Sequence, residues 1–122
     1  MKSITKKQLS GGFSFICYQD RYALCGQPQQ EDLKEFKNSA WNSILNLRNS
    51  EELRALDFEM PRSCENLGLD YNHIPIIING ELNKPALQKI HNLLHSNPDK
   101  KTVIHCASGT RSIIALIAHC FF

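Results

Sequence analysis

The residues between His105 and Ser112 have the types and spacing of a site that holds an anion against a nucleophilic sulfur. The cysteine, Cys106, follows an apolar run at 102–104 that is typical of a buried strand, and it precedes a second run at 113–118 that is typical of a buried helix. Backbone N–H groups in such a loop and at a helix start attract negative charge, and the same field lowers the pKa of a thiol. Arg111 adds a planar guanidinium that can bind two oxygens of one anion. The stretch therefore predicts a thiolate nucleophile in an anion-binding loop.

Length and composition indicate one ordinary globular domain over residues 1–122, with 42% hydrophobic and 21% charged residues. A net charge of +2 gives no argument for nucleic acid as a partner. The apolar runs fall far short of the roughly 20 residues of a membrane span, and the N-terminal residues have no secretory pattern. The five cysteines are odd in number and lack metal-ligand spacing, which argues against disulfides and against a zinc site. We expect a cytoplasmic protein with no cofactor and no metal.

Strands and helices alternate along most of the chain. Strands are predicted at 13–17, 22–25, 43–47, 71–75 and 102–104, and helices at 29–37, 51–56, 61–67, 83–97 and after the cysteine loop. An apolar loop at 76–78 runs into a turn at Asn79-Gly80. This order predicts an α/β fold with a mainly parallel central sheet flanked by helices. Cys106 then lies beyond the carboxyl end of a strand, where ligands bind in such sheets.

The sequence His-Cys-x-x-Gly-x-Arg-Ser resembles the phosphate loop of cysteine-dependent phosphatases of the tyrosine and dual-specificity type. More closely, the chain resembles a small bacterial phosphatase-like family. Its members occur alone or as the N-terminal domain of beta-lactamase-hydrolase-like proteins, ahead of a metallo-hydrolase or persulfide dioxygenase domain. The matching landmarks, spread over residues 13–118, are 26–28 with 31–33, 44–48 with Glu51, 68–71 with 73–75, and 105–112. The resemblance implies a cysteine-phosphatase-like fold that is short at its C-terminal end.

The resemblance also implies roles for the loop. Cys106 would take the phosphoryl group as a thiophosphate ester, and Ser112 would donate a hydrogen bond to the departing thiolate. His105 would orient the loop through backbone contacts. Arg111 and the loop amides would stabilise the phosphoryl oxygens; the amides are those of Ala107, Ser108, Gly109 and Thr110.

Arg48 and Glu51 are expected to brace neighbouring loops through an ion pair. The alternative for Arg48 is a direct contact with the substrate. Gln27-Pro28 is expected to start the first helix without a chemical role.

Two features depart from the larger phosphatases. Those enzymes place five residues between the cysteine and the arginine, whereas this chain places four, as do the smaller family and the rhodanese-like sulfurtransferases. They also supply an aspartate as general acid from the loop that corresponds to 76–81, where Glu81 is the only acid here. Glu81 is either that acid or a surface turn residue. A general acid typically contributes ~10²–10⁴-fold, so its loss predicts a slow enzyme or one limited to good leaving groups.

Several residues have a structural interpretation beside the chemical one. Cys106 itself can be a buried, inert thiol. His73 is interpreted as a packed strand histidine in preference to a base, and Cys64 as a half-buried thiol in preference to a redox partner of Cys106. His119 and Cys120 are interpreted as core or helix-end residues and not as metal ligands.

Three functions remain open at this point. The first is a phosphatase acting on a phosphorylated small molecule or a phosphoprotein. The second is a sulfurtransferase that carries a persulfide on Cys106, and the third is a non-catalytic domain that binds an anion or a partner. The last helix is apolar on nearly every side, so we expect a second copy of the chain or a following domain to cover it.

Overall fold

The structure, a computed structural model, describes residues 3–122 and contains strands and helices in alternation. The strands are β1 (Ile4–Gln8), β2 (Ser14–Tyr18), β3 (Tyr22–Cys25), β4 (Ser43–Asn46), β5 (Asp70–His73), β6 (Ile77–Ile78), β7 (Glu81–Leu82) and β8 (Thr102–His105). The helices are α1 (Gln30–Asn38), α2 (Ser50–Leu53), α3 (Met60–Leu67), α4 (Lys84–Ser96) and α5 (Thr110–Cys120). Most bounds lie within one or two residues of those predicted from the sequence.

Six strands form one sheet in the order β1-β2-β3-β8-β4-β5. The pairs β3–β8, β8–β4 and β4–β5 are parallel, and β1 and β2 extend the sheet as antiparallel strands. Every residue of β3, β4 and β8 is buried, as expected for parallel strands with helices on both faces. The predicted α/β fold with a mainly parallel sheet is confirmed.

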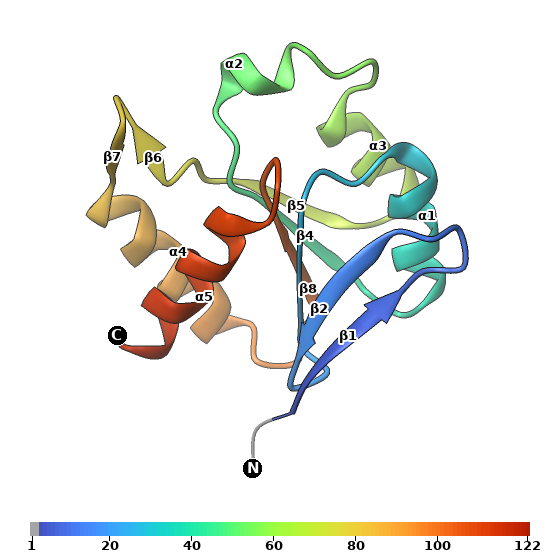
Figure 1. Ribbon diagram of the computed structural model, residues 1–122, viewed down its shortest axis with the longest axis horizontal. Coiled ribbons are helices and arrows are strands. Elements are labelled where there is room, and N and C mark those ends of the chain that lie inside the picture. The colour runs from blue at the N-terminus through green and yellow to red at the C-terminus, as the bar shows by residue number, and fades with distance from the viewer. Residues whose placement is uncertain (1–2) are drawn as a thin grey trace.

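Helices cover both faces of the sheet (Figure 1). On one face, α1 and α3 bury Leu33, Phe36 and Met60 in a core that also contains Cys25 and Val103. On the other face, α4 and α5 pack against a second core, built from residues such as Leu45, Ile90, Ile104 and Leu116. Cys106 belongs to this second core, so its side chain lies on the face of the sheet that α5 covers, and the loop that follows it leads into α5.

Local sequence sets the helix ends. At the start of α1, Gln29 and Asp32 form a capping box, and the left-handed Gly68 ends α3 at φ 71°. The side chain of Asn83 accepts a hydrogen bond from the N–H of Ala86 at the start of α4, at 2.8 Å. These signals fix the helices that carry the core and therefore the position of the sheet beneath the cysteine loop.

Two elements differ from the sequence-based predictions. Strand β1 was not predicted because all five of its residues are exposed, so it lacks the alternation of apolar and polar residues that marks a half-buried strand. The segment expected to be an apolar loop at 76–78 instead starts a two-stranded hairpin, in which Ile77 pairs with Leu82 and Ile78 pairs with Glu81. The predicted Asn79-Gly80 turn closes that hairpin, with both residues at positive φ. Among the residues described, no helix is long and apolar enough to span a bilayer.

Candidate active site

The loop after Cys106 connects β8 to α5 at the carboxyl edge of the parallel strands. Two backbone hydrogen bonds tie it to the end of β3, from Cys106 N–H to the Cys25 carbonyl at 3.3 Å and from Gln27 N–H to the Ala107 carbonyl at 3.1 Å. Gly26 allows this close approach, because a Cβ at that position would lie 2.7 Å from the Ala107 oxygen. The sequence landmark at 26–28 therefore holds the cysteine loop in place.

Gly109 turns the loop back over the sulfur. Its φ of 103° is a left-handed conformation that favours glycine, and it places Gly109 at the N-cap of α5. In this position the Gly109 N–H donates a hydrogen bond to Cys106 Sγ at 3.0 Å. The loop therefore wraps the sulfur with N–H groups while α5 begins beside it.

The surroundings of Cys106 favour its thiolate, although the residue is only 1% exposed. Burial raises the pKa of this thiol. Together, however, the hydrogen bonds from the backbone and hydroxyl of Ser112 and from the backbones of Gly109 and Arg111 lower the pKa by more than burial raises it, so the net shift is downward. The Ser112 hydroxyl lies 3.7 Å from Sγ and 3.1 Å from the Cys25 carbonyl. The sulfur is thus surrounded by donors that stabilise negative charge.

Arg111 lies between this sulfur and a carboxylate. Its Nη1 and Nη2 donate to the two oxygens of Glu52, each at 2.7 Å. The paired hydrogen bonds lower the pKa of Glu52 to about 2, so Glu52 is ionised at neutral pH. Hydrogen bonding to Glu52 raises the pKa of Arg111, with a smaller contribution from the charge of Cys106. The guanidinium is therefore fixed beside the thiolate by a residue on α2.

The partner of Arg48 differs from the one predicted. Arg48 Nε pairs with Glu52 at 3.2 Å and not with Glu51, which is exposed. The reason is the start of α2: Glu52 is its third residue, and its carboxylate turns back to accept the Asn49 N–H at 2.9 Å in a capping box. This turn points Glu52 inward, toward both arginines. The spacing Asn49-x-x-Glu52 was the signal in the sequence that could have identified it.

A further set of contacts fixes Arg48 itself. Its Nη1 donates to Gln27 Oε1 at 2.9 Å, and its carbonyl oxygen lies 2.5 Å from His73 Nε2. Gln27, expected to have no chemical role, therefore contacts both the cysteine loop and Arg48. His73 lies on β5 as a packed strand histidine that holds the Arg48 carbonyl.

His105 is fully buried beneath the loop. Its Nδ1 lies 3.3 Å from the Cys106 carbonyl, and its Nε2 has no hydrogen-bond partner among the described residues. Burial lowers the pKa of His105 to about 4, so the ring is neutral at pH 7. The ring therefore contacts the backbone of the cysteine loop, and the orienting role that the resemblance implied for His105 stays a prediction.

Glu81 lies on β7, in the hairpin drawn apart from the cysteine loop in Figure 1. It is exposed, and its side chain makes no hydrogen bond or ion pair with any described residue. Its role as a general acid stays a prediction, and nothing in the geometry supports it.

The remaining cysteine and histidine candidates lie elsewhere. Cys64 is buried on the face of the sheet opposite Cys106, where burial raises its pKa to about 12. His119 Nδ1 lies 2.9 Å from His91 Nδ1, and Cys120 is exposed at the end of α5. Over residues 3–122 no group of three or more histidine, cysteine or acidic side chains has the geometry to hold a metal ion.

Comparison with solved structures shows which fold the chain has. The chain superposes on the kinase-associated phosphatase whose catalytic-site cysteine is replaced by serine, with a TM-score of 0.74 and 20% identity over 98% of this chain and 74% of that one. It also superposes on a "putative phosphatase (DUF442)" from Shewanella putrefaciens CN-32, with a TM-score of 0.69 and 14% identity over 92% of this chain and 64% of that one. The chain therefore has the cysteine-phosphatase fold.

Sequence comparison gives a more particular likeness. No protein-family profile matches the chain. Over 97 residues it is 27% identical to the beta-lactamase hydrolase-like protein of Xylella fastidiosa strain Temecula1, an alignment that covers 78% of this chain and 22% of that protein. The chain thus spans about a fifth of the length of the curated relatives it matches. The resemblance to beta-lactamase-hydrolase-like proteins, stated from the sequence, is confirmed.

Proposed function

We propose that this protein is a cysteine-dependent phosphatase of the tyrosine and dual-specificity type. The observation that carries the proposal is the pairing of a hydrogen-bonded Cys106 sulfur, 3.0 Å from the Gly109 nitrogen, with a fixed guanidinium on Arg111. A thiolate surrounded by N–H donors is a nucleophile, and the same donors stabilise the oxygens of a phosphoryl group during transfer.

The proposed reaction has two steps. In the first, Cys106 Sγ forms a bond to phosphorus, and the bond from phosphorus to the ester oxygen breaks, so that the leaving group departs with the electron pair. In the second, water attacks the phosphorus and the S–P bond breaks. This step releases inorganic phosphate, returns the thiolate and delivers one proton to the solvent. Arg111 and the amides of 107–110 hold the phosphoryl oxygens throughout, while Glu52 holds Arg111.

The test is hydrolysis of p-nitrophenyl phosphate by the purified protein. We expect turnover that vanadate inhibits, that Cys106→Ser abolishes, and that leaves a phosphorylated Cys106 detectable by mass spectrometry after rapid acid quenching. No turnover at high enzyme concentration, together with no phosphorylated Cys106, contradicts the proposal. A phosphorylated small molecule or a phosphoprotein is the proposed substrate class.

The spacing of four residues between Cys106 and Arg111 favours a second candidate, a sulfurtransferase. In that reaction the Cys106 thiolate attacks the outer sulfur of thiosulfate, sulfite leaves with the electron pair of the S–S bond, and Cys106 carries a persulfide that a thiol or cyanide then accepts. Mass spectrometry of Cys106 after thiosulfate treatment distinguishes the two candidates, because only this one predicts an added sulfur atom. Anion binding without either reaction indicates instead a domain that only binds.

A further inference from the structure

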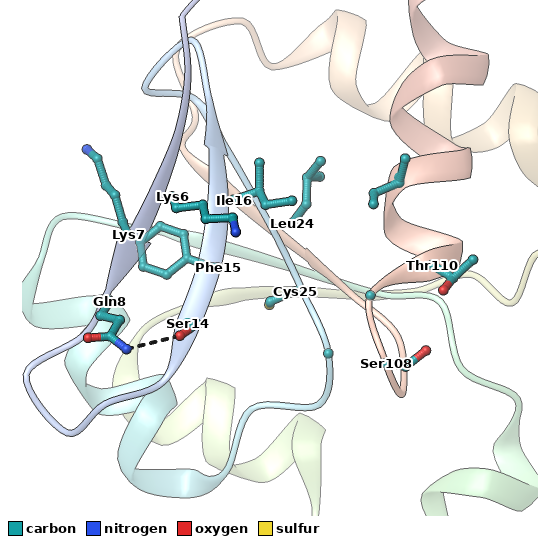
Figure 2. A pocket seen from close by; sticks show the side chains of 13 residues that line it. Lys6, Lys7, Gln8, Ser14, Phe15, Ile16, Leu24, Cys25, Ser108 and Thr110 are labelled. Carbon is teal, nitrogen blue, oxygen red and sulfur yellow. Dashed lines mark hydrogen bonds between the residues drawn. The ribbon is translucent and has the colours of Figure 1, made fainter.

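A cavity of about 670 Å³ lies beside the cysteine loop, on the face of the sheet that α5 covers (Figure 2). One of its walls consists of Ser108, Gly109 and Thr110, which are three of the four residues between Cys106 and Arg111. The same loop that surrounds the sulfur therefore forms the rim of this cavity.

The cavity combines an apolar floor with a basic side. Ile16 of β2, Leu24 of β3 and Ile113 of α5 supply its apolar surface, and Ile113 is 41% exposed. The polar residues of the lining carry hydroxyl or amide groups, the charged ones are both lysines, and none of the lining residues is acidic. Such a lining suits a molecule with an apolar body and a negative end.

Lys6 is the cation that faces the cavity. On the antiparallel ladder it lies opposite Ile16, so its side chain is on the α5 face of the sheet, and Figure 2 shows its amine directed toward the cavity. Lys7 lies opposite Phe15, extends away from the cavity in Figure 2 and pairs with Asp20 at 3.4 Å. The Lys6 side chain has no hydrogen bond or ion pair with the described residues, which leaves its charge available to a ligand.

We propose that this cavity binds a second anionic group of the substrate, so that the preferred substrate is a phosphate monoester with an apolar body and a carboxylate or second phosphate at its far end. Lys6 binds that group, and Ile16, Leu24 and Ile113 contact the body between the two charges. The proposal rests on the phosphatase function proposed above and names the substrate class of the same site.

The test compares two probes, an aryl phosphate with an alkyl chain ending in a carboxylate and its uncharged methyl ester, at several chain lengths. We expect a preference for the carboxylate in kcat/KM, expressed mainly in KM, that is largest at one chain length and shrinks with added salt. Lys6→Ala should reduce that preference about fivefold, and Lys7→Ala, the matched control, should leave it in place. A third probe that ends in a phosphate shows which of the two anions the cavity prefers.

The outcomes distinguish a failure of the anion-binding inference from a failure of the proposed phosphatase function. If both probes are hydrolysed equally, or if Lys6→Ala and Lys7→Ala change the preference alike, the cavity does not select an anion and the inference fails while the phosphatase function stands. If no probe turns over, the phosphatase function fails. Calorimetry then tests the inference by measuring the affinity of the same probes for the Cys106→Ser variant with Lys6 present and with Lys6→Ala added. Equal affinities of the two variants for the carboxylate probe overturn it.

Discussion

Replacing Glu52 with glutamine tests whether Arg111 must be held in place for activity. Two hydrogen bonds of 2.7 Å between opposite charges join the residues. A hydrogen bond to a charged group contributes about 1.5–3 kcal/mol. Glutamine keeps one acceptor oxygen for Arg111 but places an NH₂ group against the other Nη, so at least one of the two bonds is lost. If the lost hydrogen bond stabilises the transition state by that amount, kcat/KM decreases about tenfold to 150-fold.

The assay is steady-state hydrolysis of p-nitrophenyl phosphate, with Glu51→Gln as the matched control. Glu51 is the neighbouring acid of the same helix, is exposed and contacts neither arginine, so its variant should behave as the parent protein does. In an Arg111→Ala background the Glu52 substitution should cost little more, because the two side chains act through each other. Thermal unfolding of each variant shows whether the fold is retained.

Equal kcat/KM values for Glu52→Gln and Glu51→Gln would show that Glu52 does not position Arg111. An equal loss of activity from Glu52→Gln with and without Arg111 would show the same. In either case the ion pair is only a structural contact of α2 and does not position the guanidinium.

Two further predictions concern the cysteine loop and its support. The pKa of His105 is about 4 in the folded protein and near 6.5 in the unfolded chain, so the unfolded chain binds an extra proton as the pH falls. The free energy of unfolding, measured with urea, should therefore decrease by about 3 kcal/mol between pH 6.5 and pH 4. His105→Gln should flatten that decrease. A slope that is unchanged by the substitution contradicts the assignment. Gly26→Ala puts a Cβ 2.7 Å from the Ala107 oxygen and should destabilise the protein by about 1–3 kcal/mol while sharply lowering phosphatase activity; parent-like activity would show that the loop tolerates displacement.

The sequence predicted the fold where apolar periodicity was strong. The buried strands β3, β4 and β8 and the helices with caps at Gln29, Gly68 and Asn83 were all anticipated. Strand β1 was missed because an edge strand that is exposed on both faces carries no apolar pattern. Its pairing depends on β2, a partner that local sequence does not identify.

The candidate site was predictable only in part. The loop from Cys106 to Ser112 has a sequence signature, because its chemistry depends on consecutive residues. Glu52, and not Glu51, contacts the arginines because its carboxylate accepts a hydrogen bond from the Asn49 N–H at the start of α2. That capping contact brings one of two adjacent acids inward. The support that Gln27 gives to Arg48 joins residues 21 positions apart, and such a contact exists only once the sheet has formed.

The central claim is that Cys106 is a thiolate inside an anion-binding loop. Its most direct test is the rate at which iodoacetamide alkylates Cys106 as a function of pH, followed by peptide mass spectrometry with and without inorganic phosphate. We expect an inflection below the ordinary thiol pKa of 9.0, protection by phosphate, and no comparable reaction of Cys64, whose pKa burial raises to about 12. An inflection at or above 9.0, unaffected by phosphate, would contradict it.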